Sequence, residues 1–201
     1  NLYGTNEGTI SVKGTDVRIS QKTKYPWDGK VVVNVNPEND FKFTLNLRIP
    51  GWATNKPLPS DLYSYVDEQS DKYKIKLNGE EITPVQQNGY VTISRKWKAS
   101  DEIELDLPMQ VRKVKAHDLV EEDRGKIAIE KGPIVFAVEA VDNFGKVSNL
   151  ALTADAELTA SYQDHLLNGI NMLEGKAVRT DKAGVVQDLR MVPYYAWAHR
   201  G

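Results

Sequence analysis

Apolar and polar residues alternate along much of the chain, which is the pattern of β-strands with one buried and one exposed face. The clearest stretch alternates strictly from Phe41 to Ile49, and shorter ones cover 17–21, 73–77 and 103–107. Because side chains on a strand point to opposite faces in turn, each stretch predicts a strand whose apolar side packs against a second layer.

Turn signals separate these predicted strands. Asn78-Gly79 lies between two short apolar runs and predicts a tight hairpin of type I′, and Asn88-Gly89 predicts another turn. Pro50-Gly51 ends the clearest strand. Residues 54–72 carry two prolines among several serines and aspartates, so we expect an irregular insertion there.

The segment from His117 to Gly125 is charged and poor in apolar residues, which makes it the best candidate for a boundary between two units. Apolar runs beyond it predict further strands, with a short helix expected at 158–167. We therefore expect an all-β protein with two consecutive antiparallel, jelly-roll-like β-sandwich domains. The first domain would span residues 1–118, and in one version of this hypothesis its first strands precede residue 1. The second, smaller domain would span residues 119–201.

Composition narrows the function. The chain has 201 residues and no Cys, which excludes disulfides, thiolate zinc sites and a cysteine nucleophile. A formal net charge of −2 gives no electrostatic reason to expect nucleic acid or a membrane as partner. The absence of Cys leaves the compartment undecided. The first residues resemble neither a signal peptide nor a protein start, so we expect a piece of a longer protein.

Groups that could cleave a glycosidic bond are hard to find. Such cleavage normally needs two opposed carboxyl groups, but Glu80-Glu81 and 121–123 lie in polar turns and are expected to be solvated. Asp28 follows Pro26-Trp27, where capping of a turn is the usual role. The three histidines have no neighbours at metal-binding spacing, so we expect no zinc site. We therefore assign no catalytic, cofactor-binding or metal residue.

Aromatic residues at the ends of predicted strands are the remaining candidates. Large aromatic side chains there suit an interface with a neighbouring domain, and they also suit a platform on which sugar rings stack. An interface or core position is the more common role. The candidate interdomain or sugar contacts are Tyr25, Trp27, Trp52, Tyr194, Tyr195 and Trp197.

Four stretches together carry a family resemblance. They are Gln21–Gly29 (QKTKYPWDG), Phe43–Ala53 (FTLNLRIPGWA), Gly132–Ala137 (GPIVFA) and Met191–Gly201 (MVPYYAWAHRG). With these stretches, in this order and spacing, the chain resembles the C-terminal β-sandwich region of glycoside hydrolase family 127, the β-L-arabinofuranosidase-like proteins. The resemblance covers nearly the whole chain, with 54–72 as a variable insertion.

The resemblance implies where the chemistry of the parent enzyme lies. In that family an (α/α)6 barrel, which this chain lacks, holds a Cys nucleophile, a Glu acid/base and a zinc ion. The resemblance therefore implies a non-catalytic accessory segment of a bacterial glycoside hydrolase that braces the barrel or an oligomer interface. The alternatives are a carbohydrate-binding module for arabinose-containing plant glycans and an independent β-sandwich enzyme.

The expected partners follow from the same resemblance. They are the parent's own catalytic domain, a second copy in a homodimer, or a plant-derived glycan, whereas nucleic acid and membrane are not expected. A periplasmic or secreted parent is favoured, with the cytoplasm as the alternative. Tyr25, Trp27 and Trp52 are expected to pack against the barrel, so the chain alone would expose an apolar patch there and self-associate.

Overall fold

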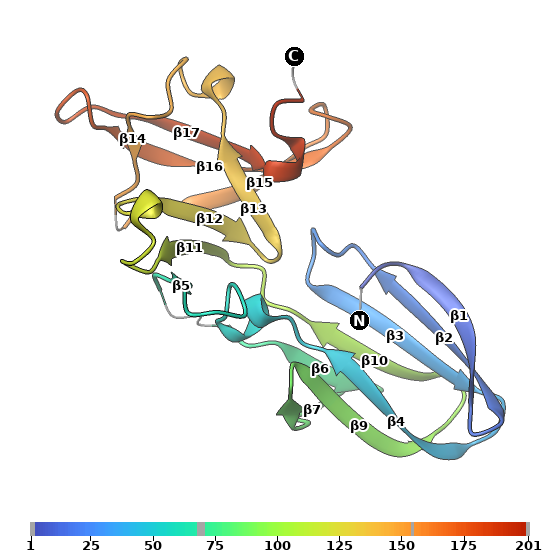
Figure 1. Cartoon of the computed structure of the whole chain (residues 1–201). Coiled ribbons are helices and arrows are strands. Elements are labelled where there is room, and N and C mark those ends of the chain that lie inside the picture. Colours follow the sequence, from blue (N-terminus) through green and yellow to red (C-terminus); the bar gives the residue numbers. More distant parts are fainter. Residues whose placement is uncertain (1–2, 68–70, 154, 200–201) are drawn as a thin grey trace. The chain divides into compact units, whose positions relative to one another are not determined.

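The computed structural model describes residues 3–67, 71–153 and 155–199, which form strands joined by turns and single 3-10 helical turns (Figure 1). The all-β class predicted from the alternation is confirmed. The chain divides into two compact units, Asn1–Met109 and Gln110–Gly201. None of the described helical turns is long or apolar enough to cross a membrane.

The division falls before the position that the sequence predicted, which was between 118 and 119. Strand β11 (Val111–Ala116), assigned in advance to the first unit, pairs with β12 (Ile127–Lys131) of the second unit. The charged segment after residue 116 contains η2 (Glu121–Asp123) and is the connection between these two paired strands. The prediction was wrong because a surface loop inside a domain and a linker between domains have the same polar composition.

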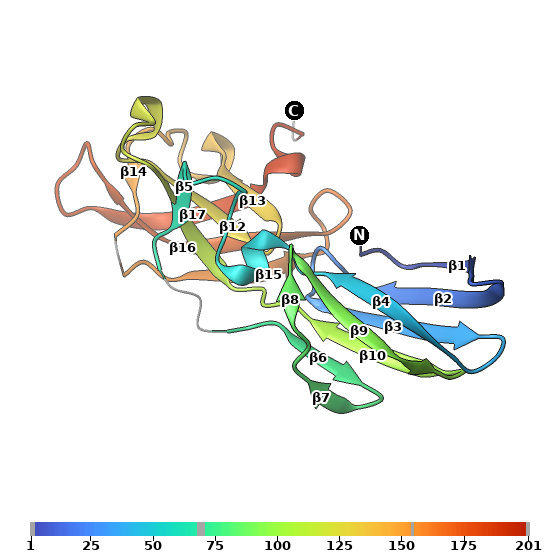
Figure 2. The ribbon, with the colours of Figure 1, turned by 60° about the horizontal axis from the view of Figure 1, so that its bottom comes forward.

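The first unit consists of two facing sheets. Their hydrogen-bonded orders are β1-β2-β3-β10-β6-β7 and β4-β9-β8. The elements of this unit are β1 (Asn6–Val12), β2 (Thr15–Thr23), β3 (Lys30–Pro37), β4 (Phe41–Arg48), η1 (Gly51–Thr54), β5 (Tyr63–Tyr65), β6 (Lys74–Leu77), β7 (Glu80–Ile82), β8 (Gln86–Gln87), β9 (Tyr90–Trp97) and β10 (Asp101–Asp106). Figure 2 shows them from a second direction.

One apolar core fills the space between the two sheets. Val33 and Ile103 reach it from the larger sheet, while Phe43, Val91 and Trp97 reach it from the smaller one. In β4 the apolar positions face inward and the polar ones face solvent, as the alternation predicted. The predicted hairpin is also confirmed, because β6 and β7 pair across Asn78-Gly79 with positive φ angles of 51° and 84°.

The segment 54–72 was predicted to be irregular. In its described part, β5 is the regular element that follows η1. Residues 68–70 lie outside the described part of the chain.

The second unit is built on one antiparallel sheet in the order β14-β16-β17-β13-β12-β11, with β15 also paired to β16. Its remaining elements are β13 (Ile134–Val138), η3 (Ala140–Asp142), β14 (Leu150–Ala151), β15 (Leu158–Gln163), β16 (Ile170–Arg179), β17 (Val186–Pro193) and η4 (Tyr194–Ala196). Val111 of β11 and Leu158 of β15, from strands far apart in this order, pack on one buried cluster. The sheet therefore curls around its own core.

The short helix expected at 158–167 is absent from the described residues, and β15 stands there instead. It pairs with β16 from Leu158↔Gly175 to Gln163↔Ile170. The local pattern of this segment is weak, and its pairing with a long neighbouring strand decides its conformation.

Candidate interaction surfaces

Two of the family-like stretches meet at one end of the first unit. The loop between β2 and β3 carries Tyr25 and Trp27, and the end of β4 leads into η1 with Trp52. The backbone nitrogen of Ile49 donates to the carbonyl of Gly89 at 2.7 Å, which brings the β8–β9 turn to the same place. Tyr25 and Trp52, far apart in sequence, are neighbours at this end of the unit.

Three aromatic rings pack in series there. The rings of Tyr25 and Trp52 stack with centroids 6.5 Å apart and an interplanar angle of 21°. Tyr3 meets Tyr25 edge to face at 6.0 Å. All three are partly buried and pack against the core of the first unit. This contact with the core holds one side of the rings in place while the other side stays accessible.

Arg48 lies beside these rings with a guanidinium that solvent can reach. Its guanidinium carbon lies 5.9 Å from the centroid of the Tyr90 ring, within range of a cation–π interaction. The hydroxyl of Tyr3 donates a hydrogen bond to the carbonyl of Arg48. We call Tyr3, Tyr25, Arg48, Trp52 and Tyr90 the aromatic end.

Burial changes the acidity of the two phenols at the aromatic end. Desolvation raises the pKa of Tyr3 above its usual value, and the nearby Tyr25 adds to the effect. Desolvation also raises the pKa of Tyr25, while a hydrogen bond from the Trp52 side chain and the positive charge of Arg48 oppose the shift. Both phenols therefore stay neutral well above neutral pH.

Trp27 lies in the same loop as Tyr25 and is 38% exposed. Its neighbour Asp28 accepts a hydrogen bond from the Lys30 backbone nitrogen at 2.8 Å, which is the capping role expected from the sequence. Gly29 follows because its backbone lies against Leu107, where a Cβ atom would come within 1.9 Å of the carbonyl oxygen. The loop that carries Tyr25 and Trp27 is therefore fixed at its C-terminal end.

The other two family-like stretches meet in the second unit, where β13 pairs with β17. The rings of Tyr194 and Trp197 stack at 6.0 Å with an interplanar angle of 8°, and Tyr194, Tyr195 and Trp197 are all exposed. The Ala198 backbone nitrogen donates to Glu139 Oε1 at 2.7 Å, which anchors the segment just after the stack. These three candidates thus form a second surface, on a different unit from the aromatic end.

A polar network supports that anchor. Asn143 is buried, and its amide nitrogen donates to the carbonyls of Glu139 and Arg190 at 2.8 and 2.9 Å. Its oxygen accepts from the Arg190 nitrogen at 3.0 Å. Desolvation raises the pKa of the nearby Asp142 carboxyl group, with Arg190 opposing the shift. The network joins η3 to β17 and so fixes the residue that holds the C-terminal aromatic segment.

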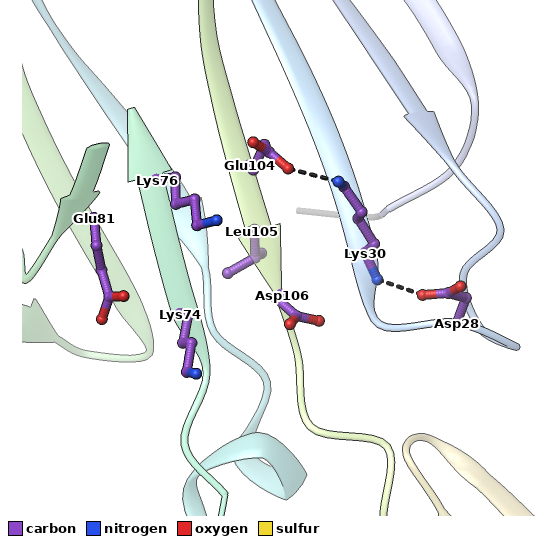
Figure 3. Close-up of a pocket in the computed structure, with 8 residues that line it drawn as sticks. All are labelled: Asp28, Lys30, Lys74, Lys76, Glu81, Glu104, Leu105 and Asp106. Carbon is purple, nitrogen blue, oxygen red and sulfur yellow. Dashed lines mark hydrogen bonds and ion pairs between the residues drawn. The ribbon is translucent and has the colours of Figure 1, made fainter. Parts of the chain in front are cut away.

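A groove on the first unit, here called the charged groove, has a volume of about 490 Å³ (Figure 3). It is lined by Asp28, Lys30, Lys74, Lys76, Glu81, Glu104, Leu105 and Asp106. The Lys30 ammonium lies 2.6 Å from the Glu104 carboxylate, whereas the Lys30 backbone nitrogen donates to Asp28. Lys30 lowers the pKa of Glu104 by hydrogen bonding and charge. A general acid for glycoside cleavage needs a raised pKa, whereas the pKa of Glu104 is lowered. Opposite charges on neighbouring strands compensate one another in this groove.

The described residues do not suit a metal ion. They include no group of three or more His, Cys, Asp or Glu side chains that could hold one. His117 accepts a hydrogen bond from the Leu119 nitrogen and His165 faces Asp164, so these two serve local contacts. The zinc site implied by the family resemblance uses Cys ligands, which this chain lacks. The described residues therefore do not fit the zinc site that the resemblance implies.

Two family models together account for nearly the whole chain. The model described as "Beta-L-arabinofuranosidase, GH127 middle domain" matches residues 1–109, and "Glycoside hydrolase family 127 C-terminal domain" matches residues 111–201. The chain belongs to glycoside hydrolase family 127. The boundary between the two GH127 domains coincides with the division of the structure after Met109. The resemblance seen in the sequence is confirmed.

Similar GH127 proteins are much longer than this chain. A non-reducing end β-L-arabinofuranosidase of Bifidobacterium longum subsp. longum is 30% identical over 90% of this chain and 28% of its own length. A solved GH127 β-arabinofuranosidase has 39% identity and a TM-score of 0.92, covering all of this chain and 32% of the other. A Geobacillus stearothermophilus T6 GH127 β-L-arabinofuranosidase has 36% identity and a TM-score of 0.87, covering all of this chain and 31% of the other.

The structure adds Tyr3, Arg48 and Tyr90 to the candidate residues. The pattern already placed Arg48 on the exposed face of a predicted strand, and Tyr90 follows the Asn88-Gly89 turn. No local signal in the sequence links Tyr3 to either of them. The predicted apolar patch shares Tyr25 and Trp52, both partly buried, with the aromatic end, and its third residue, Trp27, is exposed in the loop that carries Tyr25. The self-association expected from that patch stays a prediction.

Proposed function

We propose that this chain is the non-catalytic accessory region of a bacterial GH127 glycoside hydrolase and that it supports a catalytic part located elsewhere in the polypeptide. The match of its two units to the GH127 middle and C-terminal domains carries the proposal. The parent would be an arabinofuranosidase, because the similar proteins of B. longum and G. stearothermophilus are β-L-arabinofuranosidases. The chain spans less than a third of each of these two proteins.

The chemistry of the described surfaces supports an accessory role. In the charged groove Glu104 forms an ion pair with exposed Lys30, and the pKa of Glu104 is lowered. The two exposed or half-exposed aromatic surfaces are instead held firmly by the core and by the Glu139 anchor. Rigid aromatic surfaces suit protein–protein contact, since little side-chain freedom is lost when they are covered.

Two measurements on the purified chain and one on the longer polypeptide test the proposal. We expect no turnover of an aryl arabinofuranoside and no change in tryptophan fluorescence on titration with arabino-oligosaccharides. In the longer polypeptide, deletion of this region should lower the melting temperature of what remains, because a supported surface becomes exposed.

Turnover by the chain alone, abolished by substitution of one carboxylate, would show that the chain is itself an enzyme. Saturable binding of the oligosaccharide that disappears in Trp52→Ala would show a sugar-binding module instead. Trp97→Phe is unsuitable as the comparison variant because Trp97 is fully buried, whereas exposed Tyr162→Phe is suitable.

A further inference from the structure

Arg48 differs from five other arginines of this chain in what surrounds it. Among the described residues, no carboxylate lies within ion-pairing distance of its guanidinium, and its described neighbours are the rings of the aromatic end. Other arginines have acidic partners within 4.0 Å: these are Arg18, Arg95, Arg124, Arg179 and Arg190. An exposed guanidinium without an acidic partner, beside partly buried rings, is available to pair with a carboxylate from another segment.

We infer that the aromatic end receives a protein segment that presents an Asp or Glu carboxylate next to apolar side chains. The segment would come from the part of the GH127 polypeptide outside this chain, so the inference rests on the proposed function. This chain covers only 32% and 31% of two solved relatives. The rest of such a polypeptide is long enough to supply the segment.

The geometry indicates a carboxylate. A guanidinium group presents two parallel N–H donors that match the two oxygens of a carboxylate, and one face of Arg48 already lies toward the Tyr90 ring. A neutral sugar would leave the positive charge of Arg48 uncompensated when water is displaced. Covering the charge with an acidic group avoids that desolvation cost.

The rings next to Arg48 indicate apolar flanking residues. Tyr25 and Trp52 present stacked faces that are fixed from behind by the core, and Tyr3 closes the edge of the stack. Apolar side chains on these faces would exclude water from the neighbouring ion pair and strengthen it. An ion pair between Arg48 and a carboxylate, enclosed by aromatic rings, is the arrangement expected at the centre of an interface.

The test uses the longer polypeptide with a protease site placed directly before residue 1. After cleavage, the two pieces stay associated or separate, and their dissociation constant is measured at low and high salt. Arg48→Met removes the charge but keeps the aliphatic length, and Arg48→Lys keeps the charge but loses the paired donors. The matched control is Arg18→Met, another exposed arginine of the first unit, which pairs with Glu7.

We expect Arg48→Met to weaken the association by about tenfold or more, as for removal of one member of a buried interfacial charge pair. Arg48→Lys should give an intermediate value, and Arg18→Met should leave the association unchanged. The wild-type association should also weaken with salt more steeply than that of Arg48→Met.

Different failures have different meanings. If the pieces separate at once in the wild type, the proposed supporting function fails and this inference fails with it. If they stay together equally well in the Arg48→Met and Arg18→Met proteins, the supporting function stands and this inference is overturned. It is also overturned if Arg48 instead mediates self-association of the 201-residue chain, or if free glutamate saturates the site as tightly as the longer polypeptide.

Discussion

The Tyr25 ring stacks on the indole of Trp52, with centroids 6.5 Å apart, although the two residues belong to different strand connections. The stack forms because the β2–β3 loop and the end of β4 meet at one end of the first sandwich. It joins two of the four stretches by which the sequence resembles GH127. These residues therefore have a shared structural setting, which explains why such distant stretches belong together.

Replacement of Gly29 by Ala should destabilise the first unit. An added Cβ atom would lie 1.9 Å from the Leu107 carbonyl oxygen, and the Leu107 nitrogen donates to the Gly29 carbonyl at 3.0 Å. Because backbone atoms must move apart, we expect a loss of about 2–4 kcal/mol in the free energy of unfolding, in the range of other strained core changes. Urea denaturation followed by fluorescence measures it.

Gly8→Ala is the matched control for that change, since Gly8 lies within β1, paired with Ile19, and has nothing within 4 Å of its added Cβ. We expect it to be neutral or slightly stabilising, because alanine restricts the unfolded chain. Equal effects of the two substitutions would show that the close approach at Leu107 is not a constraint.

Trp97→Phe should weaken the core between the two sheets. Trp97 is fully buried, its indole nitrogen donates to the Phe43 carbonyl at 3.1 Å, and its ring lies 5.5 Å from that of Phe43. The change leaves a cavity and removes the hydrogen bond to the Phe43 carbonyl, for which we expect a loss of about 2–4 kcal/mol. Chemical denaturation checks the value.

Trp27→Phe is the comparison for Trp97→Phe because Trp27 is 38% exposed. We expect it to cost less than about 1 kcal/mol, since little packing is lost at an exposed ring. Similar losses for the two tryptophans would contradict the assignment of Trp97 to the core.

Asn143→Ala should loosen the second unit locally. The buried amide makes three hydrogen bonds to the backbone of Glu139 and Arg190, and the substitution removes all three. We expect a cost of about 2–3 kcal/mol and faster hydrogen exchange of the Ala198 amide, which depends on the position of Glu139. The exposed Asn46→Ala serves as control. Unchanged exchange at Ala198 would show that Asn143 does not position the anchor.

Stability should fall at high pH through the two phenols of the aromatic end. Burial raises the pKa of both Tyr3 and Tyr25 in the folded state. A raised folded pKa contributes stability that is fully present below the unfolded tyrosine pKa of about 10 and is lost as pH rises toward the folded value. Urea midpoints measured above that pH should fall, while absorbance of the phenolate reports ionisation.

Tyr25→Phe should reduce this alkaline loss, because phenylalanine has no proton to release. Tyr162→Phe, which also removes one phenol but at an exposed ring, is the control. If the Tyr25→Phe midpoints fall with pH as steeply as those of the wild type, the ionisation of Tyr25 does not contribute to the loss.

Much of the architecture could be predicted from the sequence because strand periodicity is a local property. The alternation from Phe41 to Ile49 predicted which side chains of β4 face the core, and Asn78-Gly79 predicted its hairpin. The sequence also indicated the GH127 family and most members of the two aromatic surfaces. These features depend on neighbouring residues, which a linear pattern contains.

Only the tertiary structure decided the features that depend on distant pairing. The alternation does not show which strand is the neighbour of β11, so the domain boundary was placed too late, and β15 was mistaken for a helix. Nor does it show that Arg48 lies among Tyr3, Tyr25 and Tyr90, because loop closure between sheets brings these residues together. Local chemistry determines which face of a strand is buried, but long-range hydrogen bonding determines which residues share a surface.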